Sequence, residues 1–143
     1  MSCLFESVCR LLEDRRGLLA GSRYAPLASL ARRERLAHED LRGAVCAVLD
    51  AITVHGTPLS EWGEMETGVG GYATNMRRAD AWGGGVELAA LAKGLRVPIV
   101  VRQSDGTEHT FGRAHSNGEP PLRLLYSGTH YTSDAAQRRG HVP

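Results

Sequence analysis

Apolar side chains recur at helical spacing at the start of the chain. They stand one, three or four positions apart: Leu4, Phe5, Val8, Leu11 and Leu12. Residues at this spacing share one face of an α-helix, where they are buried together. The pattern therefore predicts an amphipathic helix that carries Cys3 in its first turn.

The middle of the chain contains two more helical stripes. The first ends before Gly56 and Pro58 and predicts a core helix: Leu41, Val45, Val48, Leu49 and Ile52. The second predicts a helix whose end Gly94 loosens: Leu88, Leu91, Ala92 and Leu95. Between these elements, residues 15–39 are basic and interrupted by glycine and proline, and residues 63–85 are rich in glycine. We expect a loop and a short helix on the surface in the first segment, and a loop and a short helix that end at a turn in the second.

Strand patterns follow the last helix. Pro98 introduces the apolar run Ile99–Val101, Asp105-Gly106 is a hairpin turn signal, and apolar residues alternate over 122–126. A short loop, 127–129, then leads to His130. Because helices come first and strands later, we expect an α+β fold with a small mixed or antiparallel sheet packed between helices, in one domain over residues 1–143.

The charge balance excludes several classes of protein. Seventeen basic residues oppose sixteen acidic ones, for a net charge of +1. Four Arg-Arg pairs are therefore read as solvated surface and not as a nucleic-acid site, since no aromatic platform accompanies them. The apolar runs are too short to span a membrane, and Glu6 stands where a signal peptide has basic residues. We expect a monomer that works inside a cell.

Three cysteines are candidate reactive groups, namely Cys3, Cys9 and Cys46. They lack CxxC spacing and neighbouring histidines, so we expect free thiols, no metal and no cofactor. Only Cys3 lies at a helix N-terminus, where unpaired N–H groups and a partial positive charge favour a thiolate. A small buried apolar residue is the alternative reading of Cys3. Cys9 and Cys46 fit the apolar pattern and are expected to be structural.

His130 is a candidate base because a strand and a short loop present it, followed by the aromatic Tyr131. A loop histidine with no catalytic role is the alternative. The most distinctive segment lies between Cys3 and His130, at Trp82-Gly83-Gly84-Gly85-Val86-Glu87-Leu88. Its glycines permit close backbone approach, Glu87 suits the first turn of a helix, and Trp82 is expected to anchor the core.

Several segments in this order resemble the ovarian-tumour (OTU) family of papain-like cysteine proteases. They are Cys3-Leu4-Phe5, Leu41-Arg42, the WGG-x-x-EL segment from Trp82 with Ala89 to Ala92, strand Ile99–Val101, and the closing strand Leu122–Tyr131 with its His-Tyr pair. The resemblance implies that Cys3 is the nucleophile and His130 its base. Compact and divergent OTU domains resemble viral and bacterial effector proteins, so the expected location is the cytoplasm, and the host cytoplasm if the protein is such an effector.

The resemblance further implies a deubiquitinase that hydrolyses isopeptide or peptide bonds after the Gly-Gly tail of ubiquitin, through a thioester on Cys3. Tyr131 and Gly84 are the expected substrate-binding residues, with core packing as the alternative for Tyr131 and a structural turn as the alternative for Gly84. Two other functions remain open on the sequence: a ubiquitin-binding pseudoenzyme, and a viral protease of the same fold that processes its own polyprotein.

Two positions depart from the OTU pattern. The family carries Asp-Gly-Asn before the cysteine, where backbone groups help to form the oxyanion hole, but only Met1 and Ser2 precede Cys3. A short natural N-terminus, a segment of a longer precursor and a differently built oxyanion hole are the alternatives; a free α-amino group would itself favour the thiolate. Thr132 stands where the family has an orienting Asn or Asp. Thr132 is our candidate third catalytic residue, with Asp134 or a simple dyad as alternatives.

Overall fold

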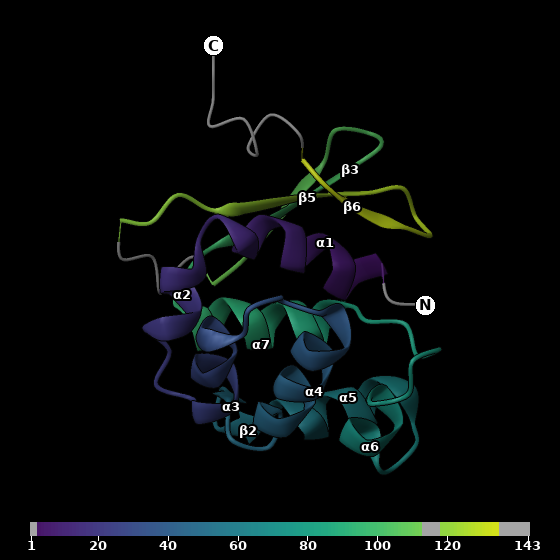
Figure 1. The fold of residues 1–143 in the computed structure, drawn as a ribbon. Helices are drawn as coiled ribbons and strands as arrows, with labels where there is room; N and C mark the ends of the chain where they lie inside the picture. The colour runs from purple at the N-terminus through teal and green to yellow at the C-terminus, as the bar shows by residue number, and fades with distance from the viewer. Residues whose placement is uncertain (1–2, 113–117, 135–143) are drawn as a thin grey trace.

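Helices cover one face of a small sheet in the computed structural model, which describes residues 3–112 and 118–134 (Figure 1). The helices are α1 (Cys3–Glu13), α2 (Arg16–Ala20), α3 (Ala25–Ala28), the 3-10 helix η1 (Ser29–Arg32), α4 (His38–Val48), α5 (Leu59–Thr67), α6 (Tyr72–Met76) and α7 (Gly85–Leu95). None of these helices is both long and apolar enough to cross a membrane.

The sheet is mixed and has the strand order β4-β3-β5-β6. Its strands are β3 (Ile99–Gln103), β4 (Glu108–Phe111), β5 (Leu122–Tyr126) and β6 (Tyr131–Ser133). β3 and β5 run parallel, whereas β4 and β6 pair antiparallel at the two edges. A separate two-stranded ladder joins β1 (Thr53–Val54) to β2 (Thr57–Pro58). The expected α+β class with a small mixed sheet is confirmed.

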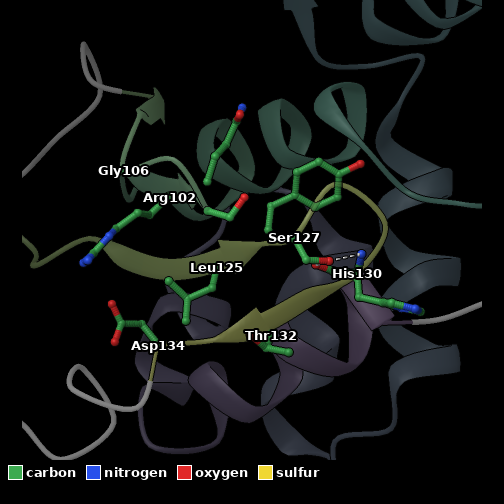
Figure 2. Close-up of a pocket in the computed structure, with 10 residues that line it drawn as sticks. Arg102, Gly106, Leu125, Ser127, His130, Thr132 and Asp134 are labelled. Atoms are coloured by element: carbon green, nitrogen blue, oxygen red, sulfur yellow. Dashed lines mark hydrogen bonds between the residues drawn. The ribbon is translucent and has the colours of Figure 1, made fainter.

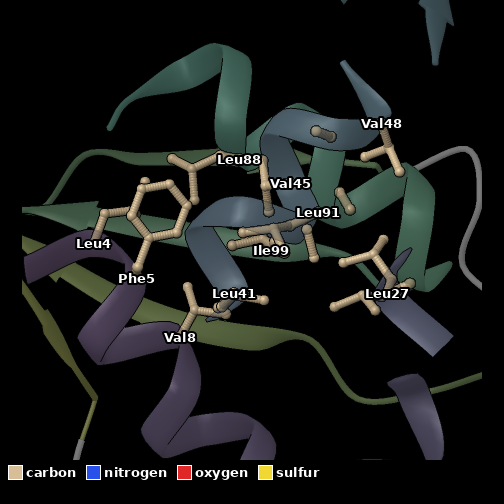
Figure 3. Close-up of a cluster of buried hydrophobic side chains, with 14 of the residues drawn as sticks. Leu4, Phe5, Val8, Leu27, Leu41, Val45, Val48, Leu88, Leu91 and Ile99 are labelled. Atoms are coloured by element: carbon tan, nitrogen blue, oxygen red, sulfur yellow. The ribbon is translucent and has the colours of Figure 1, made fainter. Parts of the chain in front are cut away.

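The core lies between α1, α4, α7 and the inner face of the sheet (Figure 3). The predicted stripe of α1 is buried in full, and Phe5 and Val8 have no exposed surface. Leu41 and Val45 of α4 and Leu88 and Leu91 of α7 meet this stripe, and Ile99 closes the core from the sheet. The three helical stripes of the sequence therefore face one another.

The hairpin signal at Asp105-Gly106 is confirmed. Gly106 adopts a φ of +89°, in the left-handed region that favours glycine. The Gln103 N–H donates to the Thr107 carbonyl at 2.8 Å, and the Gly106 N–H donates to the Gln103 carbonyl at 2.9 Å. These bonds close the turn between β3 and β4.

Residues 15–39 differ from the prediction of a surface loop with a short helix. Three short helices fill this segment, and Leu19, Leu27 and Leu30 are buried. Gly94 makes room for this layer, because a Cβ there would lie 2.6 Å from Leu27 Cδ1. Gly94 therefore permits close packing and does not loosen α7. Glycine and proline interrupt the leucines along the chain, so no continuous stripe revealed their burial.

Leu27→Ala tests whether this segment belongs to the core. Removing a fully buried leucine should lower the free energy of unfolding by about 2–5 kcal/mol, measured by urea denaturation with circular dichroism. The exposed Arg35→Ala is the control, with an expected change within about 0.5 kcal/mol. Equal, small changes in both variants would mean that residues 15–39 contribute little to the core.

Candidate active site

Cys3 is the first residue of α1 and is partly exposed, whereas Cys9 and Cys46 are buried. Burial raises the pKa of the Cys9 thiol to about 12, and Glu13 and Asp40 add to the rise. Burial also raises the pKa of the Cys46 thiol, to about 11. Both buried cysteines therefore stay protonated at neutral pH. Cys3 alone of the three combines solvent access with a helix N-terminus.

His130 lies at the end of the turn between β5 and β6, and this turn is tied by its own hydrogen bonds. Ser127 Oγ accepts from the N–H groups of His130 and Thr129, at 3.1 and 3.4 Å (Figure 2). Tyr126 Oη donates to the Gly128 carbonyl at 2.8 Å. The backbone of His130 is thus fixed while its side chain remains exposed.

Strand β6 packs directly on α1 and so brings the two ends of the chain together. Ser7 Oγ of α1 donates to the Tyr131 carbonyl at 3.0 Å. The Tyr131 ring is half-buried and stacks on Tyr126, with centroids 4.4 Å apart. Burial raises the pKa of Tyr131 to about 12, and Tyr126 and Cys3 contribute electrostatically. Tyr131 is therefore held between Tyr126 and α1, the helix that begins at Cys3; its role as a wall for substrate stays a prediction.

Trp82 joins this site from the middle of the chain. Its ring centroid lies 6.1 Å from that of His130, with the two planes inclined at 44°. The side chain is 53% exposed. The expectation that Trp82 anchors the core is therefore wrong, because its indole lies at the surface beside the imidazole of His130.

The glycines after Trp82 press the loop against α1 and begin α7. A Cβ on Gly83 would lie 2.6 Å from Leu4 Cδ2, so any larger residue would displace the buried Leu4 side chain in the first turn of α1. Gly84 is the N-cap of α7: its N–H donates to Glu87 Oε1 at 2.7 Å, and its carbonyl accepts from the Leu88 N–H. Since both polar backbone groups of Gly84 are bonded inside the protein, its structural role is established and substrate binding stays a prediction.

Glu87 is fully buried beneath this loop. Tyr72 Oη donates to its Oε2 at 2.6 Å, while its other oxygen holds Gly84. Burial raises the pKa of the carboxyl, and these two hydrogen bonds act in the opposite direction. Glu87 therefore holds the start of α7 in place, as the sequence predicted for the first turn of a helix.

Arg42 is a contributor that sequence reasoning missed, since it entered only as part of the Leu-Arg resemblance. Its guanidinium is buried and donates to the carbonyls of Met76 at 2.8 Å and Ala81 at 3.0 Å. It also lies over the Phe5 ring, 4.6 Å from the centroid. The sequence feature that could have revealed this role is a cationic residue next to Leu41 in the apolar stripe of α4.

Thr132 and Asp134 line a cavity of about 640 Å³ together with His130 (Figure 2). The three residues share one side of the chain, as alternation predicted. No side-chain hydrogen bond joins Thr132 to His130 within residues 118–134, and Figure 2 shows His130 and Asp134 at opposite ends of β6. The identity of the orienting residue stays a prediction.

Three distant segments thus meet at one end of the fold: the start of α1, the Trp82 loop and the His130 turn. No hydrogen bond joins Cys3 Sγ to the His130 imidazole among the described residues. Catalytic hydrogen bonds are often long without substrate and shorten in the complex. The oxyanion-hole prediction concerns Met1 and Ser2, which lie outside the described residues. Within the described ranges, no three His, Cys, Asp or Glu side chains cluster to hold a metal ion.

Comparison with known proteins agrees with this arrangement. Deubiquitinase OTUD6B of Xenopus laevis is 37% identical over an alignment of 68 residues that covers 43% of this chain and 22% of that protein. The match therefore spans about a fifth of that relative's length. A solved OTU domain in complex with ubiquitin has the same fold, with a TM-score of 0.64 at 19% identity over 92% of this chain and 62% of that one.

A family model described as OTU-like cysteine protease matches residues 2–136, which include Cys3, the Trp82 loop and His130. The resemblance inferred from the separate motifs is thereby confirmed. This chain belongs to the OTU-like cysteine protease family.

Proposed function

We propose that the chain is a deubiquitinase that cleaves the bond after the C-terminal glycine of ubiquitin. The observation that carries the proposal is the meeting of a partly exposed, helix-terminal Cys3 with the strand that follows His130. Membership of the cysteine protease family supports the chemistry. The ubiquitin-bound relative and the similarity to OTUD6B support the substrate.

The reaction is acyl transfer through a thioester. His130 takes the proton of Cys3, and the N-terminus of α1 stabilises the thiolate. Sγ attacks the carbonyl carbon of the ubiquitin glycine, the bond to the lysine or α-amine nitrogen breaks, and His130 returns its proton to the leaving amine. Water then attacks the thioester, which releases the ubiquitin carboxylate and restores the Cys3 thiol.

The site suits a narrow substrate tail. Trp82 and His130 project from two loops with their ring centroids 6.1 Å apart, and Gly83, next to Trp82, lies against Leu4 in the first turn of α1. An extended Gly-Gly segment has no side chains to clash with these rings, whereas bulkier residues do. We further propose that the protein acts on ubiquitin conjugates in the cytoplasm, where thiols such as its free cysteines stay reduced.

A ubiquitin probe with a C-terminal electrophile tests the proposal. The wild type should form a covalent adduct, detected by mass spectrometry, and Cys3→Ala should form none. His130→Gln should slow adduct formation by about 10²–10⁴-fold, because the general base is lost. Cys46→Ala, which alters a buried thiol, is the control that should still react. Ubiquitin binding without any adduct would instead identify a pseudoenzyme.

Selective alkylation tests the assignment of the thiols. In the folded protein at about pH 8, iodoacetamide should modify Cys3 and spare Cys9 and Cys46, whose raised pKa values keep them protonated. In denaturant all three should react. Peptide mapping by mass spectrometry locates the adducts. Modification of Cys9 or Cys46 before Cys3 in the native protein would contradict the assignment.

Thr132→Val and Asp134→Asn distinguish the two candidate orienting residues. If Thr132 holds the imidazole, Thr132→Val should lower kcat/KM for a fluorogenic ubiquitin substrate by about tenfold, the value of one hydrogen bond. Asp134→Asn should then remain near the wild type. A larger loss in Asp134→Asn would transfer the role to Asp134, and two near-normal variants would mean a Cys-His dyad.

A further inference from the structure

Arg42 attaches the Trp82 loop to the interior of the protein. The loop runs from the end of α6 at Met76 to the start of α7 at Gly85. Arg42 Nη1 holds the Met76 carbonyl, and Nη2 holds the Ala81 carbonyl immediately before Trp82. Between these two anchors, Arg78 and Asp80 pair at the exposed surface. The buried guanidinium therefore binds the loop at two points, at its start and at the residue before Trp82.

The other side of Trp82 is held by a second buried polar side chain, the carboxyl of Glu87. Glu87 accepts from the Gly84 N–H at 2.7 Å, two residues beyond Trp82. Arg42 and Glu87 are both almost fully buried, on different helices. Trp82 and Gly83 thus lie between two fixed points of the backbone, while the indole itself is exposed and makes little contact with the core.

Arg42 also contacts the helix that carries Cys3. Its guanidinium carbon lies 4.6 Å from the centroid of Phe5, and Phe5 has no exposed surface. A Cβ on Gly83 would be 3.2 Å from the same Phe5 ring. One planar cation therefore contacts both the first turns of α1 and the Trp82 loop. A lysine ammonium cannot reproduce this geometry, because it lacks the rigid fork of donors and the flat face.

We infer that Arg42 is a positioning residue for the active site: it holds Trp82 beside His130 and in register with Cys3. The inference rests on the proposed Cys3–His130 site. A residue that only fills the core would affect the stability of the fold, but not the relation between the two exposed rings. Displacement of the loop by about 1 Å would instead cost up to about 10²-fold in turnover, because the site would no longer be preorganised.

Fluorescence of Trp82 reports its distance from His130 without any need for activity. Trp62→Phe leaves Trp82 as the single tryptophan. An imidazole beside an indole quenches its emission, so Trp62→Phe should fluoresce less than Trp62→Phe with His130→Gln. The difference in intensity between these two variants measures the quenching of Trp82 by His130.

Arg42→Met, made with Trp62→Phe, is the decisive variant because methionine fills similar space without donors. We expect the quenching by His130, measured against the same variant with His130→Gln, to fall sharply and kcat to drop by about 10–10²-fold with little change in KM. Arg42→Lys should give an intermediate result. Arg78→Met, which removes an exposed cation from the same loop, should change neither quenching nor kcat.

The outcomes separate the possible roles. A folded Arg42→Met with normal quenching and normal kcat, but a lower unfolding midpoint, would overturn the inference. If Arg42→Met does not fold, folded Arg42→Lys decides: unchanged quenching and kcat would overturn the inference, and a loss of both would support it. If the wild type forms no ubiquitin adduct while quenching still depends on Arg42, the proposed function fails and the positioning of Trp82 by Arg42 stands.

Discussion

Burial of the apolar face of α1 is the interaction on which the rest of the structure depends. The helix packs against α4 and against β5 and β6, so it closes the core and joins the first residues of the chain to the last described strand. Phe5 and Leu12 have no exposed surface. Because Cys3 is the first residue of this helix, the hydrophobic contacts that stabilise the fold also determine where the thiol lies.

Buried polar groups add directional hydrogen bonds to the contacts of the hydrophobic core. Burying a polar or charged group is costly unless hydrogen bonds compensate it. Arg42 donates to two carbonyls of the loop around Trp82, and Glu87 accepts from Gly84 of this loop and from Tyr72. Ser7 of α1 likewise links two elements, because its hydroxyl donates to the Tyr131 carbonyl of β6. The exposed residues of the candidate site are thus supported by a buried layer of directional contacts, as preorganised sites require.

The site itself joins one helix to two loops. Cys3 belongs to a long helix, whereas His130 and Trp82 belong to loops whose backbones are fixed by local bonds from Ser127 and by Arg42 and Glu87. The outer face of the sheet beside His130 forms the cavity lined by Thr132 and Asp134. The same histidine therefore borders two surfaces, the Trp82 loop on one side and this cavity on the other.

Local periodicity determined much of the fold. The stripes of α1, α4 and α7, the strands β3 and β5 and the Asp105-Gly106 turn were all readable from the sequence, because each depends on residues a few positions apart. The Trp82 segment identified the family, and Cys3 and His130 emerged as candidates from their places beside predicted elements.

Only the tertiary structure decided the burial of Leu27, the exposure of Trp82 beside His130 and the role of Arg42. The hydrogen bonds of Arg42 join residues 34 and 39 positions apart, and that of Ser7 to Tyr131 spans 124 positions. Such contacts leave no periodic trace along the chain. They form only when the packing of α1, α4 and α7 brings these distant residues together.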